Sequence, residues 1–178
     1  MHTADNKLLE MLTGYAAAHQ HPVNIFVHLV GIPTIMLGVL IPLTWVGMDL
    51  GPVHLTLAHV VLAGFFLFYL TLDAVFALTF LVGGYLLTLL AMRIGALPPA
   101  TSGLIAGACF VGGYIAQFIG HAIERSMPVL VRHPIQANLA APFFTVVELF
   151  KLAGLRDDLF HRVQANVAAR RQEMPESR

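Results

Sequence analysis

The chain has 178 residues, of which 57% are hydrophobic and 11% are charged, and its formal net charge is zero. Soluble domains usually carry about 25% charged residues, so the charges here are too few to cover a water-facing surface and most of the outer surface must face lipid. The neutral charge balance excludes an electrostatic interface for nucleic acid, and the presence of only one cysteine, Cys109, excludes an intramolecular disulfide.

Four apolar stretches have roughly the 20 residues that a helix needs to cross a bilayer. The expected spans cover about 25–46, 54–71, 74–92 and 100–123. Residues 47–52 have a turn composition, Asp73 marks the turn of a hairpin between the second and third spans, and Pro98 and Pro99 end the third. We therefore expect one membrane domain over residues 1–178, an all-α polytopic bundle of four transmembrane helices.

The C-terminal third of the chain is more polar. Residues 139–152 are apolar but too few for a span, so we expect an interfacial or re-entrant helix there, followed by a flexible tail over 170–178. Most of the ten Lys and Arg residues follow the fourth span, and only Arg93 lies in a loop on the opposite side. The bias of basic residues toward the cytoplasm then predicts that both termini are cytoplasmic.

Small residues predict where the spans pack closely. Gly83 and Gly84 in the third span and Gly103, Gly107, Gly112 and Gly113 in the fourth would let these two helices approach each other. The glycine-rich face of the fourth span suits packing within the monomer or across a homo-oligomer interface.

Polar side chains gather at places that the topology brings together. Four antiparallel spans put the start of the first span, the turn of the hairpin and the end of the fourth span at one membrane face. The side chains at these three places are His19, His21, Asn24, His28, Asp73, Gln117, His121 and Glu124. Ionisable groups within membrane spans are costly and mark a functional site by default.

The candidate metal ligands are His19, His28 and His121. Imidazole is the commonest metal ligand among side chains, and three histidines, or two with a carboxylate, suit iron(II) or zinc with coordination positions left for substrate. The candidates for orienting a ligand or contacting substrate are Asn24, Gln117 and His133, and those for catalytic proton transfer are Glu124 and Asp73.

A structural alternative stands beside each of these assignments. A single histidine near a membrane interface is often a packing or headgroup contact, and Asp73 has a second explanation as a turn residue. The sequence lacks the motifs GxSxG, HExxH and CxxC, a phosphate-binding loop, and the spaced histidine clusters of membrane di-iron enzymes. This pattern favours one metal ion over two.

Two stretches carry a family resemblance. The first is Tyr15-x3-His19-x2-Pro22-x-Asn24-x3-His28-x2-Gly31-x-Pro33, and the second is Gln117-Phe118-Ile119-Gly120-His121-x2-Glu124-x3-Pro128 followed by Gln136-x5-Pro142-x5-Glu148. Together they resemble the fungal 2-hydroxy-palmitate dioxygenase (Mpo-one-like) family of small membrane proteins, over roughly residues 8–152. Arg125 stands where a lysine is familiar in the family, which keeps the charge.

The resemblance implies an enzyme of lipid α-oxidation. Its expected substrates are a 2-hydroxy fatty acid and O2, its cofactor is Fe(2+), and its product is the fatty acid one carbon shorter, as in sphingolipid breakdown; His19, His28 and His121 fall on the motif histidines. The expected location is a bacterial inner membrane, or the endoplasmic reticulum in a eukaryote. Two alternatives remain open at this point: a zinc-dependent membrane lipid hydrolase that uses the same cluster, and a non-enzymatic transporter or scaffold.

Overall fold

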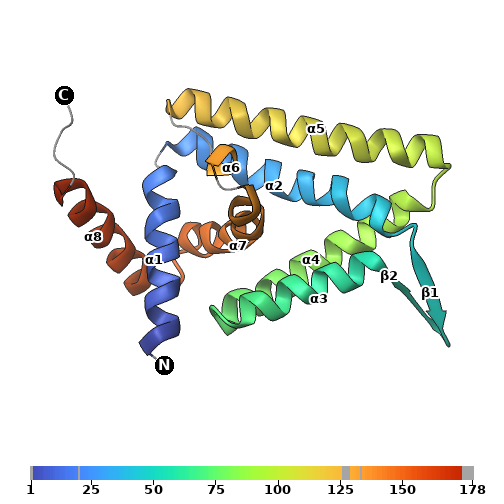
Figure 1. Cartoon of the computed structure of the whole chain (residues 1–178), viewed down its shortest axis with the longest axis horizontal. Helices are drawn as coiled ribbons and strands as arrows, with labels where there is room; N and C mark the ends of the chain where they lie inside the picture. The colour runs from blue at the N-terminus through green and yellow to red at the C-terminus, as the bar shows by residue number, and fades with distance from the viewer. Residues whose placement is uncertain (1, 20, 126–128, 133, 174–178) are drawn as a thin grey trace.

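The computed structural model describes residues 2–19, 21–125, 129–132 and 134–173. Over these residues the chain is an all-α membrane helix bundle with one small β-hairpin (Figure 1). In chain order the elements are α1 (His2–Ala18), α2 (Pro22–Leu43), β1 (Gly47–Leu50), β2 (Val53–Thr56), α3 (Leu57–Leu70), α4 (Ala74–Gly95), α5 (Pro99–Glu124), α6 (Val129–Arg132), α7 (Pro134–Leu152) and α8 (Asp157–Glu173).

Within the described residues, three helices are long and apolar enough to cross a membrane, namely α2, α4 and α5. They match the expected first, third and fourth spans to within a few residues at most ends. Local signals explain where they begin: α2 and α5 start at a proline in their first turn, and the Asp73 carboxylate caps α4 by accepting hydrogen bonds from two backbone N–H groups.

The expected second span is wrong at its start. Residues 53–56 form strand β2, which pairs antiparallel with β1 through a turn where Gly51 has a φ of +63°. Helix α3 therefore has only 14 residues, fewer than the roughly 20 of a usual span. The hairpin lies at the end of the bundle opposite to α1 and α8, and Asp49 pairs with His54 across its strands (Figure 1).

Glycines bring α2 and α5 into close antiparallel contact. A Cβ atom on Gly38 would come within 2.6 Å of the backbone nitrogen of Phe110, and one on Gly113 within 2.5 Å of a side-chain atom of Ile35. By contrast, a Cβ on Gly107 would have nothing within 4 Å. The expectation of a glycine-mediated contact between the third and fourth spans, α4 and α5, is thus corrected: the close pair is α2 with α5.

This close contact leads to a stability prediction. Replacing Gly38 by alanine is expected to lower the free energy of unfolding by about 1–3 kcal/mol, because the added carbon meets rigid backbone rather than a flexible side chain. Gly107→Ala in the neighbouring helix is the matched control, and it should be neutral or stabilising by up to about 1 kcal/mol through helix propensity. Thermal unfolding in detergent measures both, and equal melting temperatures for the two variants would contradict the close approach.

The C-terminal helices fold back over one end of the bundle. Helix α7 starts at Pro134, five residues before the expected start of 139, and buries one face that includes Phe143, Phe144 and Glu148. A bend of 112° separates α7 from α8. Helix α8 continues to Glu173, so the expected tail is helical over 170–173, while 174–178 lie outside the described residues.

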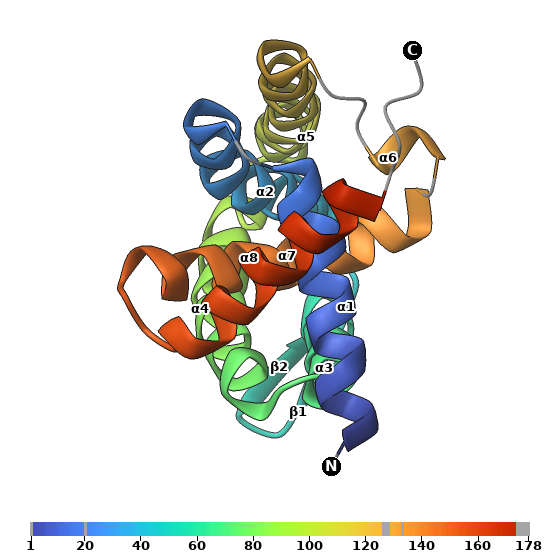
Figure 2. The ribbon, with the colours of Figure 1, turned by 90° about the vertical axis from the view of Figure 1, so that its left-hand side faces the viewer.

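Helix α8 packs beside α1, as Figure 2 shows from the end of the molecule. Leu8 and Leu12 of α1 and Val163 and Val167 of α8 are buried in one hydrophobic cluster with side chains of α7 and α4. This cluster fixes α1 across the end of the bundle, where the chain passes into α2.

Candidate metal centre

Three segments that are distant in sequence bring three histidines together. His19 follows the last residue of α1, His28 lies in the second turn of α2, and His121 lies in the last turn of α5. Their ring centroids are 4.5–5.1 Å apart, and they are only 4%, 7% and 4% exposed. One nitrogen of each ring lies within 4.8 Å of the others, a spacing that suits one metal ion.

Backbone carbonyls fix the orientation of two of the rings. Nδ1 of His28 lies 2.8 Å from the carbonyl oxygen of Asn24, and Nδ1 of His19 lies 3.0 Å from that of Tyr15. Because a carbonyl oxygen can only accept a hydrogen bond, each Nδ1 must carry the proton. Each Nε2 is then a bare lone pair, the form in which histidine binds a metal.

The two lone pairs face each other. Nε2 of His19 lies 3.2 Å from Nε2 of His28, and two neutral rings with protonated Nδ1 atoms have no hydrogen to share there. A cation between them removes the repulsion. A proton is a poor candidate because burial, together with the neighbouring His28, lowers the pKa of His19 to about 3.

A metal ion fits this geometry. Two nitrogen ligands bound at about 2.0–2.1 Å and meeting at about 90–109° lie roughly 2.8–3.4 Å apart, and the observed separation of 3.2 Å falls within that range. Three neutral imidazoles would leave the ion its positive charge, which favours an anionic substrate group in the remaining positions. The residues present therefore fit a bound divalent metal.

Aromatic packing holds His19 in place. Its ring stacks on Tyr15 at 3.9 Å between centroids, and Tyr15 stacks in turn on Phe144 of α7 at 3.8 Å. Burial and the nearby carboxylates of Glu148 and Glu124 raise the pKa of Tyr15, so its phenol stays neutral. Sequence reasoning did not assign Tyr15 or Phe144 to the site, although Tyr15 sits one helical turn before His19.

Glu124 connects the ends of α5 and α2. Its carboxylate accepts hydrogen bonds from the backbone N–H of His21, at 3.1 Å, and from the side-chain amide of Asn24. Asn24 is fully buried, and a Cβ on Gly120 would overlap its amide oxygen. Since the carbonyl of Asn24 orients His28, Glu124 holds the residue that positions a candidate ligand.

The other candidates from the sequence lie in different surroundings. Gln117 is buried one turn before His121 and donates to the carbonyl of Val27 at 3.4 Å. Asp73 is not part of the histidine group. It caps α4 and pairs at 2.6 Å with Arg156, the residue just before α8, so its catalytic role stays a prediction. His133 lies outside the described residues.

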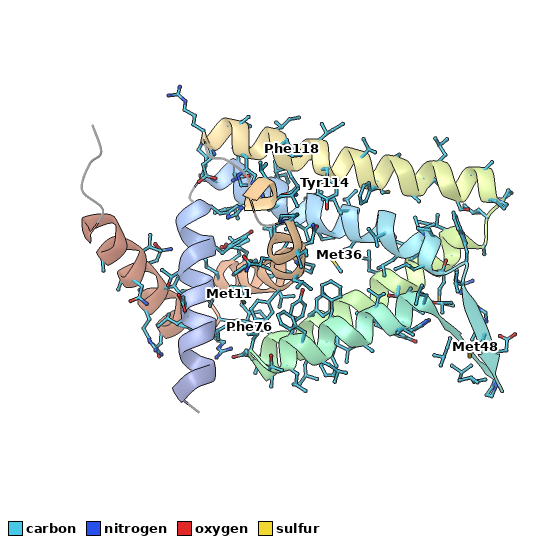
Figure 3. The ribbon with its side chains drawn as sticks, viewed as in Figure 1. Met11, Met36, Met48, Phe76, Tyr114 and Phe118 are labelled. Atoms are coloured by element: carbon cyan, nitrogen blue, oxygen red, sulfur yellow. The ribbon has the colours of Figure 1, made fainter. Side chains whose placement is uncertain are left out.

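The histidines lie at one end of a large cavity. Its volume is about 690 Å³, and its walls come from α1, α2, α3, α4, α5, α6 and α7. Polar side chains near the histidines include Tyr15 and Gln117, whereas the walls from α3 and α4 are apolar. In Figure 3, Tyr114 and Phe118 lie on α5 and Met36 lies on α2, on the side that faces this space.

Comparison with known proteins identifies the family. The family model described as 2-hydroxy-palmitic acid dioxygenase Mpo1-like matches residues 6–152, a range that includes all three histidines and Glu124 and stops before α8. No curated protein and no solved structure matches the chain. Because the match covers most of the sequence, the chain belongs to the 2-hydroxy-palmitic acid dioxygenase Mpo1-like family.

Proposed function

We propose that this protein is a membrane-embedded, iron(II)-dependent dioxygenase that shortens 2-hydroxy fatty acids by one carbon. The observation that carries the proposal is the buried group of His19, His28 and His121 at the head of a largely apolar cavity. The family to which the chain belongs is named for a 2-hydroxy-palmitic acid dioxygenase, and the cavity suits a substrate with one polar end and a long hydrocarbon chain.

The proposed reaction balances without a second reductant. A 2-hydroxy acid and O2 yield the acid one carbon shorter, carbon dioxide and water: the bond between C1 and C2 breaks, and the substrate supplies all four electrons that O2 accepts. A bound redox-active metal would provide Lewis-acid polarisation and electron transfer to O2. Zinc has no redox chemistry, which is why iron is proposed for a dioxygenase.

The protein's own residues would position the substrate and shield the reacting carbon from water. The three imidazoles stay neutral and present Nε2 or Nδ1 lone pairs inward, while the carboxylate and 2-hydroxyl of the substrate take the polar end of the cavity. Gln117 and the neutral phenol of Tyr15 line that end and are placed to donate hydrogen bonds to substrate oxygens. Burial keeps water away from the reacting carbon, which strengthens each of these polar interactions.

We place the histidine end of the bundle at the cytoplasmic face. Helices α1 and α8 cover that end, and most Lys and Arg residues follow α5, as expected for the cytoplasmic side. The substrate's carboxylate would then lie near the membrane surface and its chain within the bilayer depth.

The test is turnover of a defined substrate by purified, iron-loaded protein. We expect oxygen uptake with 2-hydroxypalmitate, with one pentadecanoate and one CO2 formed per O2 consumed, and none with palmitate, which lacks the 2-hydroxyl. Stoichiometric zinc in anaerobically purified protein with hydrolase activity and no oxygen uptake would instead favour the hydrolase alternative.

A further inference from the structure

We infer that the substrate's hydrocarbon chain lies along one face of α2, and that Met36 limits the chain length the site accepts. The inference rests on the proposed function and adds a specificity-determining position to it. It starts from the spacing of the α2 residues that line the cavity: His28, Ile32, Ile35, Met36, Val39 and Leu40. Offsets of 4, 7, 8, 11 and 12 residues fall on a single helical face.

This face runs from a polar end to an apolar end. His28 supplies the candidate ligand, and each later position on the face is aliphatic or methionine. A helix rises 1.5 Å per residue, so Met36 lies about 12 Å and Leu40 about 18 Å along α2 from His28. An extended hydrocarbon chain advances roughly 1.25 Å per bond of about 1.5 Å, so roughly 14 bonds cover the whole length.

The facing wall is also apolar. It is formed by Val61, Leu62 and Phe65 of α3 and Phe80 of α4. The side chain of Leu62 packs against Gly84 of α4. A Cβ atom on Gly84 would come within 2.5 Å of the Leu62 side chain. The glycine lets Leu62 lie close to α4, and both Leu62 and Met36 line the cavity. Figure 3 shows Met36 on the side of α2 that faces α3 and α4.

Met36 is the position best placed to control chain length. It is partly buried and flexible and it lines the cavity, so a larger side chain there would project into the cavity. A substrate of eight carbons ends before reaching it, whereas one of sixteen carbons must pass it. Blocking this position should therefore discriminate between the two lengths while leaving the histidine end intact.

The experiment compares Met36→Trp with Val30→Trp, both on α2. Val30 is 54% exposed and does not line the cavity, so it controls for the added indole. We expect Met36→Trp to lower the ratio of kcat/KM for 2-hydroxypalmitate to that for 2-hydroxyoctanoate at least tenfold, and Val30→Trp to leave the ratio unchanged. An unchanged ratio in Met36→Trp, with metal content and melting temperature preserved, would overturn the inference.

A second readout does not depend on turnover. A 2-hydroxypalmitate analogue with a diazirine at its last carbon should label residues 32–40 or 57–70 of the wild-type protein, and Met36→Trp should lose that labelling. Labelling confined to other segments would also overturn the inference. Wild-type protein that labels as expected but oxidises neither acid would refute the proposed dioxygenase activity and leave the chain-binding face standing.

Discussion

Replacing either His28 or His121 by alanine is expected to abolish stoichiometric metal binding. Each residue presents a ring nitrogen to a buried point shared with the other two histidines. The loss in affinity should exceed the roughly 10–100-fold that follows removal of a residue that only orients a ligand. Metal analysis after equilibration with excess iron(II) under anaerobic conditions measures the effect, and oxygen uptake should disappear in parallel.

His54→Ala is the matched control for this experiment. His54 lies in the β-hairpin at the opposite end of the bundle, where its partner is Asp49. It should retain full metal content and full oxygen uptake. If His28→Ala and His121→Ala also retained their metal, the histidine group would be a packing arrangement and the dioxygenase proposal would fail with it.

The second large effect is expected at Glu124. Glu124→Gln keeps the size of the side chain, but it removes the negative charge and replaces one of the two carboxylate oxygens, which accept from Asn24 and from the backbone N–H of His21, with an NH2 group that cannot accept. The start of α2 should then lose its fixed position, and with it the carbonyl that orients His28. We expect metal affinity to fall by about 10–100-fold, with partial recovery at high iron concentration, a recovery that loss of a ligand would not allow.

Asp73→Ala separates this role from a general effect of losing a carboxylate. Asp73 caps α4 and pairs with Arg156, whose guanidinium also lies 4.7 Å from the ring centre of Phe76. Its loss should lower the free energy of unfolding by about 1–2 kcal/mol while leaving metal affinity unchanged. A loss of metal affinity equal to that of Glu124→Gln would restore Asp73 as a candidate for the site.

The approach of His28 to His121 could be predicted because it follows from two simple constraints, the length of the apolar segments and the rarity of polar side chains within them. Apolar stretches of the right length are expected to cross a membrane, and the four spans expected from the sequence would bring the helix ends that carry His28 and His121 to the same face. Polar residues in such helices rarely lack a function. Neither argument needs side-chain packing, so the meeting of His28 with His121 could be predicted from the sequence. The same arguments also selected Asp73, which lies outside the histidine group.

Features that depend on packing partners were not predictable in the same way. Gly112 and Gly113 are neighbours in sequence but 100° apart around α5, and only Gly113 meets α2. The sequence shows which small residues a helix contains. Only the packed structure shows which of them lie on the face that contacts the neighbouring helix. The stacking of Tyr15 between His19 and Phe144 likewise depends on α7. No local sequence pattern predicts where α7 lies relative to α1.

The predicted start of the second span was wrong for a different reason. Residues 53–56 contain no Asp, Glu, Lys or Arg and lead directly into α3, yet Gly51 and Pro52 allow them to pair with residues 47–50 as a hairpin. The backbone hydrogen bonds of that pairing compete with those of a longer helix, and hydropathy does not distinguish the two outcomes.

The packing of α8 on α1 links His19, the first candidate metal ligand in the sequence, to the last helix that the structure describes. The residues that pack against α1 include Val163 and Val167 of α8. The ribosome adds them after it has made α2, α4 and α5. We therefore expect His28 and His121 to meet once α5 has inserted, and His19 to join them later, after α8 has packed on α1. Assembly of the three-histidine group would then be a late step of biogenesis, because it needs segments from both the start and the end of the polypeptide.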